Sequence, residues 1–99
     1  KLLPKARIDE IAAAVQTGDT DGARMVVKRL APAASRRIER RLFTDEASRR
    51  RAEVYIRRYQ TLVGDAMVRD PEGFLMANLL GDDAGRLYLL LDAAAGDLV

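Results

Sequence analysis

The 99-residue chain contains no cysteine and no histidine, and these two absences exclude several kinds of site at once. Disulfide scaffolds and thiolate nucleophiles require cysteine, and protein zinc sites are built mainly from cysteine and histidine. Histidine is also the side chain that most readily exchanges protons near neutral pH. We therefore expect no metal site and no cofactor site.

Aromatic residues and prolines are scarce as well, since the chain has only three tyrosines, two phenylalanines and three prolines. Hydrophobic residues make up 48% of the chain, which is typical of a folded domain. No apolar run approaches the roughly 18 residues needed to cross a bilayer, and the N-terminus lacks a signal-peptide pattern. We expect a soluble, all-α domain over 1–99, a compact bundle of five or six helices, with the cytoplasm as the default location.

Charge is unevenly distributed along the chain, although the formal net charge is only +2. Residues 24–58 contain twelve basic and four acidic side chains, whereas residues 59–99 contain two basic and seven acidic ones. Either the acidic C-terminal part packs near the basic middle, or the basic stretch meets an anionic partner. We favour the internal explanation slightly.

The longest helical pattern runs from Thr44 to Arg69. Its apolar residues recur at spacings of three and four, which places them along one side of an α-helix, with arginines on the other side. Thr44 is the predicted N-cap, followed by two acidic residues that suit the first turn. Gly64 lies inside this pattern and is a candidate for a bend.

Shorter helical patterns lie on both sides of this segment. The predicted helices cover 5–16, 21–30, 35–42, 45–69 and 71–95, the last divided in two if the chain breaks between Gly81 and Asp83. Thr20 or Asp21 is expected to cap the second helix and Ser35 the third. Asp70 followed by Pro71 is typical of a helix start. The first two helices should form an antiparallel hairpin, because their connecting turn is short.

The predicted core combines the apolar faces of these helices. Its members are Ile11, Val15, Val27, Leu30, Tyr59, Leu62, Phe74, Leu79, Leu87 and Leu91. The last helix is apolar nearly all round, so it should be either central to the core or partly covered by a partner.

Three weak resemblances lie in the turn between the first two helices. The segment GDTDG resembles the start of a calcium loop, but Ala23 and Leu30 occupy the fifth and twelfth positions, which require oxygen ligands. The hairpin is loosely similar to a DNA-reading helix-turn-helix, except that Asp19 and Arg24 stand where that motif needs apolar residues. The segment GDTDGA also looks a little like the turn of tetratricopeptide hairpins. We favour an ordinary hairpin and assign no family.

Residues suited to catalysis are few. Asp70 with Glu72, or Asp82 with Asp83, could pair as acid and base, but each pair lies where a helix cap is expected. No nucleophile pattern or glycine-rich phosphate loop accompanies them. We therefore expect that the protein is not an enzyme.

The favoured function is a small protein–protein interaction module, with an adaptor, regulatory or scaffolding role, that docks a partner or a second copy of itself. The expected apolar contact surface belongs to the two C-terminal helices and consists of Phe74, Leu75, Leu79, Leu87, Leu90 and Leu91. Arginines would set its orientation or bind anions, namely Arg36, Arg37, Arg40, Arg41, Arg49, Arg50 and Arg57.

The alternative function is a nucleic-acid-binding domain that uses the arginine-rich segment 36–58. Interleaved acids and scarce aromatics make this alternative the second choice. The chain does not begin with methionine. We therefore also expect that it is a piece of a longer protein, either multidomain or membrane-anchored.

Overall fold

The computed structural model describes residues 3–95, and all regular secondary structure in this range is α-helical. The six helices are α1 (Lys5–Gln16), α2 (Thr20–Leu30), α3 (Pro32–Thr44), α4 (Glu46–Arg69), α5 (Phe74–Gly81) and α6 (Asp83–Ala95). The predicted all-α bundle is confirmed, and so is the break near Gly81 that divides the last segment in two.

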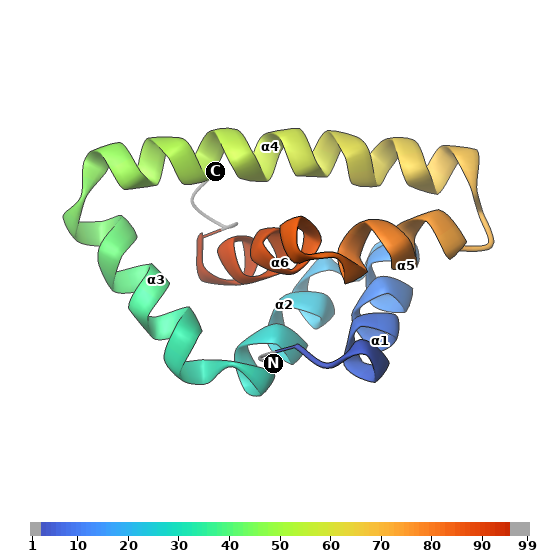
Figure 1. The fold of residues 1–99 in the computed structure, drawn as a ribbon, viewed down its shortest axis with the longest axis horizontal. Helices are drawn as coiled ribbons and strands as arrows, with labels where there is room; N and C mark the ends of the chain where they lie inside the picture. The colour runs from blue at the N-terminus through green and yellow to red at the C-terminus, as the bar shows by residue number, and fades with distance from the viewer. Residues whose placement is uncertain (1–2, 96–99) are drawn as a thin grey trace.

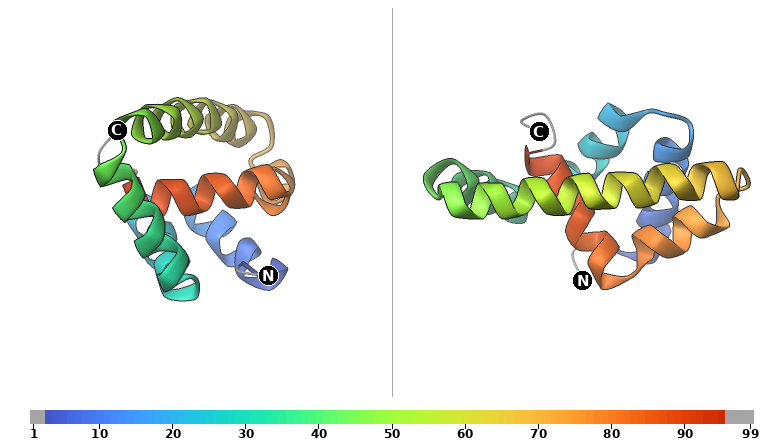
Figure 2. Two further views of the ribbon diagram at one scale, coloured as in Figure 1. Left: turned by 60° about the vertical axis from the view of Figure 1, so that its left-hand side comes forward. Right: turned by 90° about the horizontal axis from the view of Figure 1, so that it is seen from above.

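Helix α4 sets the length of the molecule and α6 lies at its centre. A helix of 24 residues is about 36 Å long, and the longest dimension of the fold is 40 Å. Figure 1 shows α4 along one edge of the fold, and Figure 2 shows α6 crossing beneath it. Helix α6 packs against α2, α3, α4 and α5. The apolar last helix is therefore central to the core.

Helix α4 begins one residue later than the sequence predicts. Thr44 ends α3, and its hydroxyl donates back to the Arg40 carbonyl over 2.9 Å. Asp45 is the N-cap instead, because its carboxylate accepts from the Ala47 and Ser48 amides at 3.1 and 3.3 Å. The helix continues through Gly64, the candidate for a bend, and runs nearly straight in Figure 1.

Two other predicted caps were also misplaced. The carboxylate of Asp19, rather than Thr20 or Asp21, accepts the Gly22 amide at 2.9 Å and caps α2. Helix α3 begins at Pro32, so the expected start at Ser35 is wrong by one turn. Proline suits the first turn of a helix because its nitrogen needs no hydrogen bond there.

Helix α5 begins later than predicted because residues 71–73 form a turn. Gly73 has a φ of 92°, a left-handed conformation that favours glycine. The Asp70 carboxylate still organises this corner, since it accepts the amides of Glu72 and Leu75 at 3.1 and 2.9 Å.

The main core lies where α4 and α6 meet α1, α2 and α5. Its buried members are Leu3, Ile8, Ile11, Ala12, Ala23, Val27, Ile56, Tyr59, Val63, Met76, Leu80, Tyr88, Leu89 and Ala93. The predicted core positions Ile11, Val27 and Tyr59 are confirmed as buried. Four other predicted positions are half-buried against a core cluster, namely Val15, Leu30, Leu79 and Leu91.

Three predicted core residues are wrong, because Leu62, Phe74 and Leu87 are 48%, 69% and 45% exposed. The buried face of α4 is narrower than its apolar pattern. It consists of Ala52, Ile56, Tyr59, Val63 and Ala66, at alternating spacings of four and three. A neighbour in sequence lies about 100° around the helix, so Leu62 falls beside this face. Phe74 and Leu87 likewise flank the buried positions of α5 and α6.

Candidate functional groove

An apolar groove with a volume of about 310 Å³ lies between α3, α4 and α6. The residues that line it are Ile38, Arg41, Leu42, Ser48, Arg51, Ala52, Tyr55, Leu87 and Leu91. Helices α3 and α6 each contribute an aliphatic pair spaced by four residues, which places both members of each pair on one helical face. Leu42 and Ala52 are buried in the floor, whereas Leu87 is exposed at the mouth.

The groove is open because small side chains lie beneath it. Among residues 3–95, a second, small core cluster contains only Leu42, Ala52 and Ala95 as buried members, with Ile38 and Leu91 packed against them. Two of the three buried members are alanines, which cannot fill the angle between the converging helices. The remaining space is the groove.

Two arginines border this apolar space. The guanidinium groups of Arg41 and Arg51 both donate to the Ser48 hydroxyl, at 3.4 and 3.3 Å. The Ser48 hydroxyl in turn donates to Asp45 over 2.8 Å. This hydrogen bond is the largest of several causes that lower the pKa of the Asp45 carboxyl. Within residues 3–95, neither arginine forms an ion pair with a carboxylate.

Tyr55 closes one side of the groove. Its hydroxyl donates to the Ala84 carbonyl over 2.7 Å and so ties α4 to the start of α6. Burial raises the pKa of Tyr55 above its ordinary value. The phenol is therefore a fixed, uncharged part of the wall at neutral pH.

The predicted apolar contact residues do not form one surface. Leu87 and Leu91 line the groove, whereas Leu79 and Leu90 pack against the main core. Phe74 borders a separate hollow of about 500 Å³ between α1 and the start of α5. The neighbouring Leu75 is 45% exposed.

The predicted arginines are brought together only in part, since Arg37, Arg40 and Arg41 border one open hollow at the end of α3. Arg41 alone among them lines the groove. Arg50 forms an exposed ion pair with Glu46 over 3.0 Å. The remaining members are exposed and form no ion pair within the described residues, namely Arg36, Arg37, Arg40, Arg49 and Arg57.

One observed ion pair fits the favoured internal explanation for the charge asymmetry, in which the acidic C-terminal part packs near the basic middle. Among the ion pairs of residues 3–95, only Arg24 with Asp92 joins the basic middle to the acidic C-terminal part. Most of the arginine segment therefore faces solvent.

Six of the groove residues were absent from the predicted contact sets: Ile38, Leu42, Ser48, Arg51, Ala52 and Tyr55. One signal for them was present in the sequence, since Ile38 and Leu42 form an isolated aliphatic pair in an otherwise arginine-rich helix. The sequence contained no signal for the convergence of this pair with Leu87 and Leu91.

Two of the four acidic residues considered for catalysis, Asp70 and Asp82, act as structural caps. Asp70 accepts backbone amides at the start of the α5 corner. Asp82 accepts the Gly85 amide at 2.7 Å and the Tyr59 hydroxyl at 3.4 Å. Within residues 3–95, no group of three acidic side chains is arranged to hold a metal ion.

Comparison of the chain with known protein families, curated proteins and solved structures finds no match. In the described part of the chain, no helix is both long enough and apolar enough to span a membrane. Function is therefore inferred from the geometry of the groove.

Proposed function

We propose that this protein is an α-helical interaction module that binds an acidic, amphipathic segment of another protein in the groove between α3, α4 and α6. The observation that carries the proposal is the combination of an open apolar floor with the two arginines at its border, Arg41 and Arg51.

The apolar floor supports a helical ligand. The walls of the groove belong to α6, which contributes Leu87 and Leu91, and to α3, which contributes Ile38 and the deeper Leu42. A partner helix with apolar residues three or four positions apart could place them between these walls, as in other helix-in-groove complexes. Burial of this surface would supply most of the affinity.

The arginines favour an acidic ligand. Arg41 and Arg51 share one serine hydroxyl as acceptor, and a guanidinium group binds a carboxylate more strongly through paired hydrogen bonds. Carboxylates on both sides of an apolar stripe would therefore fix the register of the ligand and speed its association. Nucleic acid fits this site less well, because the aliphatic side chains of the floor have no hydrogen-bond donors or positive charge that could bind phosphates.

The proposal can be tested by selecting peptides from a displayed random library on the wild-type protein. We expect enriched peptides with two or three aliphatic residues at helical spacing and flanking aspartate or glutamate. Leu87→Glu and Arg51→Glu should each weaken binding of a selected peptide at least tenfold, while circular dichroism remains unchanged.

Two matched variants on α4 serve as controls. Val68→Glu adds the same charge as Leu87→Glu at a position that is 81% exposed and outside the groove. Arg58→Glu repeats the charge reversal of Arg51→Glu, also outside the groove. Both should bind like wild type, and equal losses in controls and groove variants would contradict the proposal.

Ionic strength and molar mass separate the competing functions. Nucleic-acid binding should weaken log-linearly with salt, because neutralised phosphates release counterions. Binding of the acidic, amphipathic peptide should depend on salt only through its contacts with the two arginines. Recovery of nucleic acid without any enriched peptide would replace our proposal with the alternative, and a concentration-dependent dimer broken by Leu87→Glu would replace the foreign partner with a second copy.

A further inference from the structure

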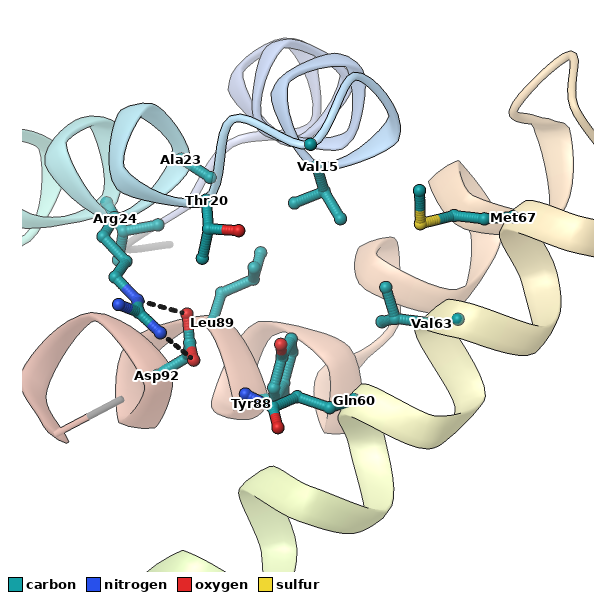
Figure 3. A pocket seen from close by; sticks show the side chains of 13 residues that line it. Val15, Thr20, Ala23, Arg24, Gln60, Val63, Met67, Tyr88, Leu89 and Asp92 are labelled. Carbon is teal, nitrogen blue, oxygen red and sulfur yellow. Dashed lines mark hydrogen bonds and ion pairs between the residues drawn. The ribbon is translucent and has the colours of Figure 1, made fainter. Parts of the chain in front are cut away.

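A second cavity, of about 330 Å³, lies between α2, α4 and α6, and it shares no lining residue with the groove. Figure 3 shows side chains from these helices, and from the end of α1, surrounding the space. One wall is apolar and includes Val15, Val63 and Met67. Five polar side chains also line the cavity, those of Thr20, Arg24, Gln60, Tyr88 and Asp92.

The hydroxyl of Tyr88 is the unusual feature of this cavity. Three tyrosines form a stacked series, in which ring centroids are 5.7 Å apart for Tyr55 and Tyr59 and 4.9 Å apart for Tyr59 and Tyr88. The Tyr55 and Tyr59 hydroxyls donate to the backbone carbonyls of Ala84 and Leu79. The Tyr88 side chain is only 7% exposed, yet its hydroxyl has no hydrogen-bond partner among the described residues.

The missing partner points to the interior of the cavity. Figure 3 shows the Tyr88 hydroxyl directed into the space that the labelled side chains surround. Tyrosine hydroxyls in apolar surroundings usually make a hydrogen bond, and here the acceptor has to be a molecule inside the cavity, either water or a ligand. Burial also raises the pKa of Tyr88 well above its ordinary value, so the hydroxyl remains protonated and able to donate.

The charge of the cavity wall determines which molecules can enter. Arg24 and Asp92 form a two-fold contact, with nitrogen–oxygen distances of 3.0 and 3.2 Å. Their side chains are 14% and 9% exposed. Arg24 also lies 4.0 Å from Asp21, so its charge is already compensated by carboxylates and the wall has no uncompensated cation for a ligand. A charged molecule would lose its hydration without gaining a counter-ion.

We propose that this cavity binds a small uncharged molecule whose apolar body contacts Val15, Val63 and Met67 and whose carbonyl or hydroxyl oxygen accepts the Tyr88 proton. The volume lies at the lower end of the range for small-molecule pockets. Several apolar groups together with a few convergent polar ones are the usual lining of such pockets. Water alone could accept the Tyr88 proton, but the apolar side chains of the cavity wall would then remain in contact with water, which is unfavourable.

Three probes with the same ring test this assignment: cyclohexanone, cyclohexanecarboxylate and cyclohexylammonium. Each is titrated into the full chain labelled with ¹⁵N, and amide shifts are followed by NMR. Gly18 and Gly64 line the cavity and report binding, whereas the exposed Ala33 on α3 is the reference. We expect saturable shifts at both glycines with cyclohexanone only. Shifts that never saturate, or equal binding of a charged probe, would overturn the proposal.

Two variants locate the probe. Tyr88→Phe keeps the ring and removes the hydroxyl, and loss of one hydrogen bond should weaken cyclohexanone binding about threefold to tenfold. Gly64→Leu places a side chain at the cavity wall, where an added Cβ meets no atom within 4 Å, and should abolish binding. Val68→Leu, on the same helix but outside the cavity, should bind like wild type.

The two variants protect the test against a folding defect. If Tyr88→Phe fails to fold, Gly64→Leu still decides the result, because its change is confined to an exposed helix position. Undiminished cyclohexanone binding by Gly64→Leu, or by a folded Tyr88→Phe, would show that the probe lies elsewhere and would overturn the proposal.

Discussion

The two ends of α4 pack against core clusters of very different size. From Ile56 to Val63 the helix lies on the main core, which contains buried residues from α1, α2, α4, α5 and α6. Near its N-terminus the helix contributes only Ala52 to a cluster with two other buried members, Leu42 and Ala95. The buried face of α4 is therefore fully covered over the main core, whereas near the N-terminus it leaves the space that forms the groove.

This difference suggests a division of roles along one helix. Fully buried apolar side chains stabilise the fold through their removal from water. Half-exposed ones, such as Leu87, retain apolar surface that a ligand can cover. Substitutions at the main-core end should therefore reduce stability, whereas substitutions at the groove end should chiefly reduce binding. The following experiments test this division, from the largest expected effect to the smallest.

The largest effect is expected from breaking the Arg24–Asp92 pair, which joins α2 to α6 beside the main core. Asp92→Ala removes the nearer carboxylate from a largely buried guanidinium group, and should lower the free energy of unfolding by about 3–5 kcal/mol, toward the lower end because Asp21 remains 4.0 Å away. The double variant Arg24→Met with Asp92→Leu should recover much of this loss, because no buried charge remains. Urea denaturation measures both, and equal instability of the single and double variants would contradict the expectation.

Truncation of core residues compares the two ends of α4 directly. Ile56 is fully buried in the main core, and Ile56→Ala should cost about 2–5 kcal/mol. Leu42→Ala removes a floor residue of the small cluster, where an adjoining groove already exists, and should cost about 2 kcal/mol. Leu62→Ala, at a half-exposed position, should change stability by only about 0.5 kcal/mol. A larger loss at Leu42 than at Ile56 would break the comparison.

Two glycines should respond in opposite directions to alanine. An added Cβ at Gly85 would overlap the Leu79 carbonyl oxygen, since α5 and α6 approach closely there. Gly85→Ala should therefore cost about 1–3 kcal/mol. At Gly64 the same methyl group meets nothing within 4 Å, so Gly64→Ala should raise stability by up to about 1 kcal/mol. Thermal unfolding of both variants against wild type provides the measurement.

The smallest effect on stability at neutral pH is expected from the titration of Tyr59. Burial raises the pKa of this phenol from 10.0 to about 12. A raised pKa means that folding favours the protonated phenol. The stabilisation is complete below pH 10 and is lost as the pH rises toward 12. We expect a decline in the denaturation midpoint over this interval. Tyr59→Phe should reduce this decline, and an equally steep decline in that variant would assign the effect to other groups.

The helices themselves were largely predictable from the sequence, because apolar spacing and capping residues are local properties. The stretches near 5–16, 21–30 and 45–69 were placed to within one residue of their observed bounds. Errors arose where neighbouring residues compete for one local role. Thr44 and Asp45 can both cap a helix, and the carboxylate of Asp45 is the one that reaches two amides.

The candidate groove was predicted only in part. Leu87, Leu91 and Arg41 were named from the sequence, but Phe74 and Leu75 were grouped with them although they lie at the start of α5. An apolar pattern states which residues avoid water without stating which helix covers them. Burial of Met76 and exposure of Phe74, two residues apart, followed from the position of α5 against α1.

The sequence by itself determined the helical class, the break after Gly81 and the excess of arginine from position 36 to 58, since each depends on composition or on contacts within a few residues. Tertiary structure alone decided that Ile38 and Leu42 meet Leu87 and Leu91 in one groove. It also paired Arg24 with Asp92, 68 positions away. These contacts depend on how six helices cross, and the crossing is fixed by the fit of side chains that are far apart in the chain.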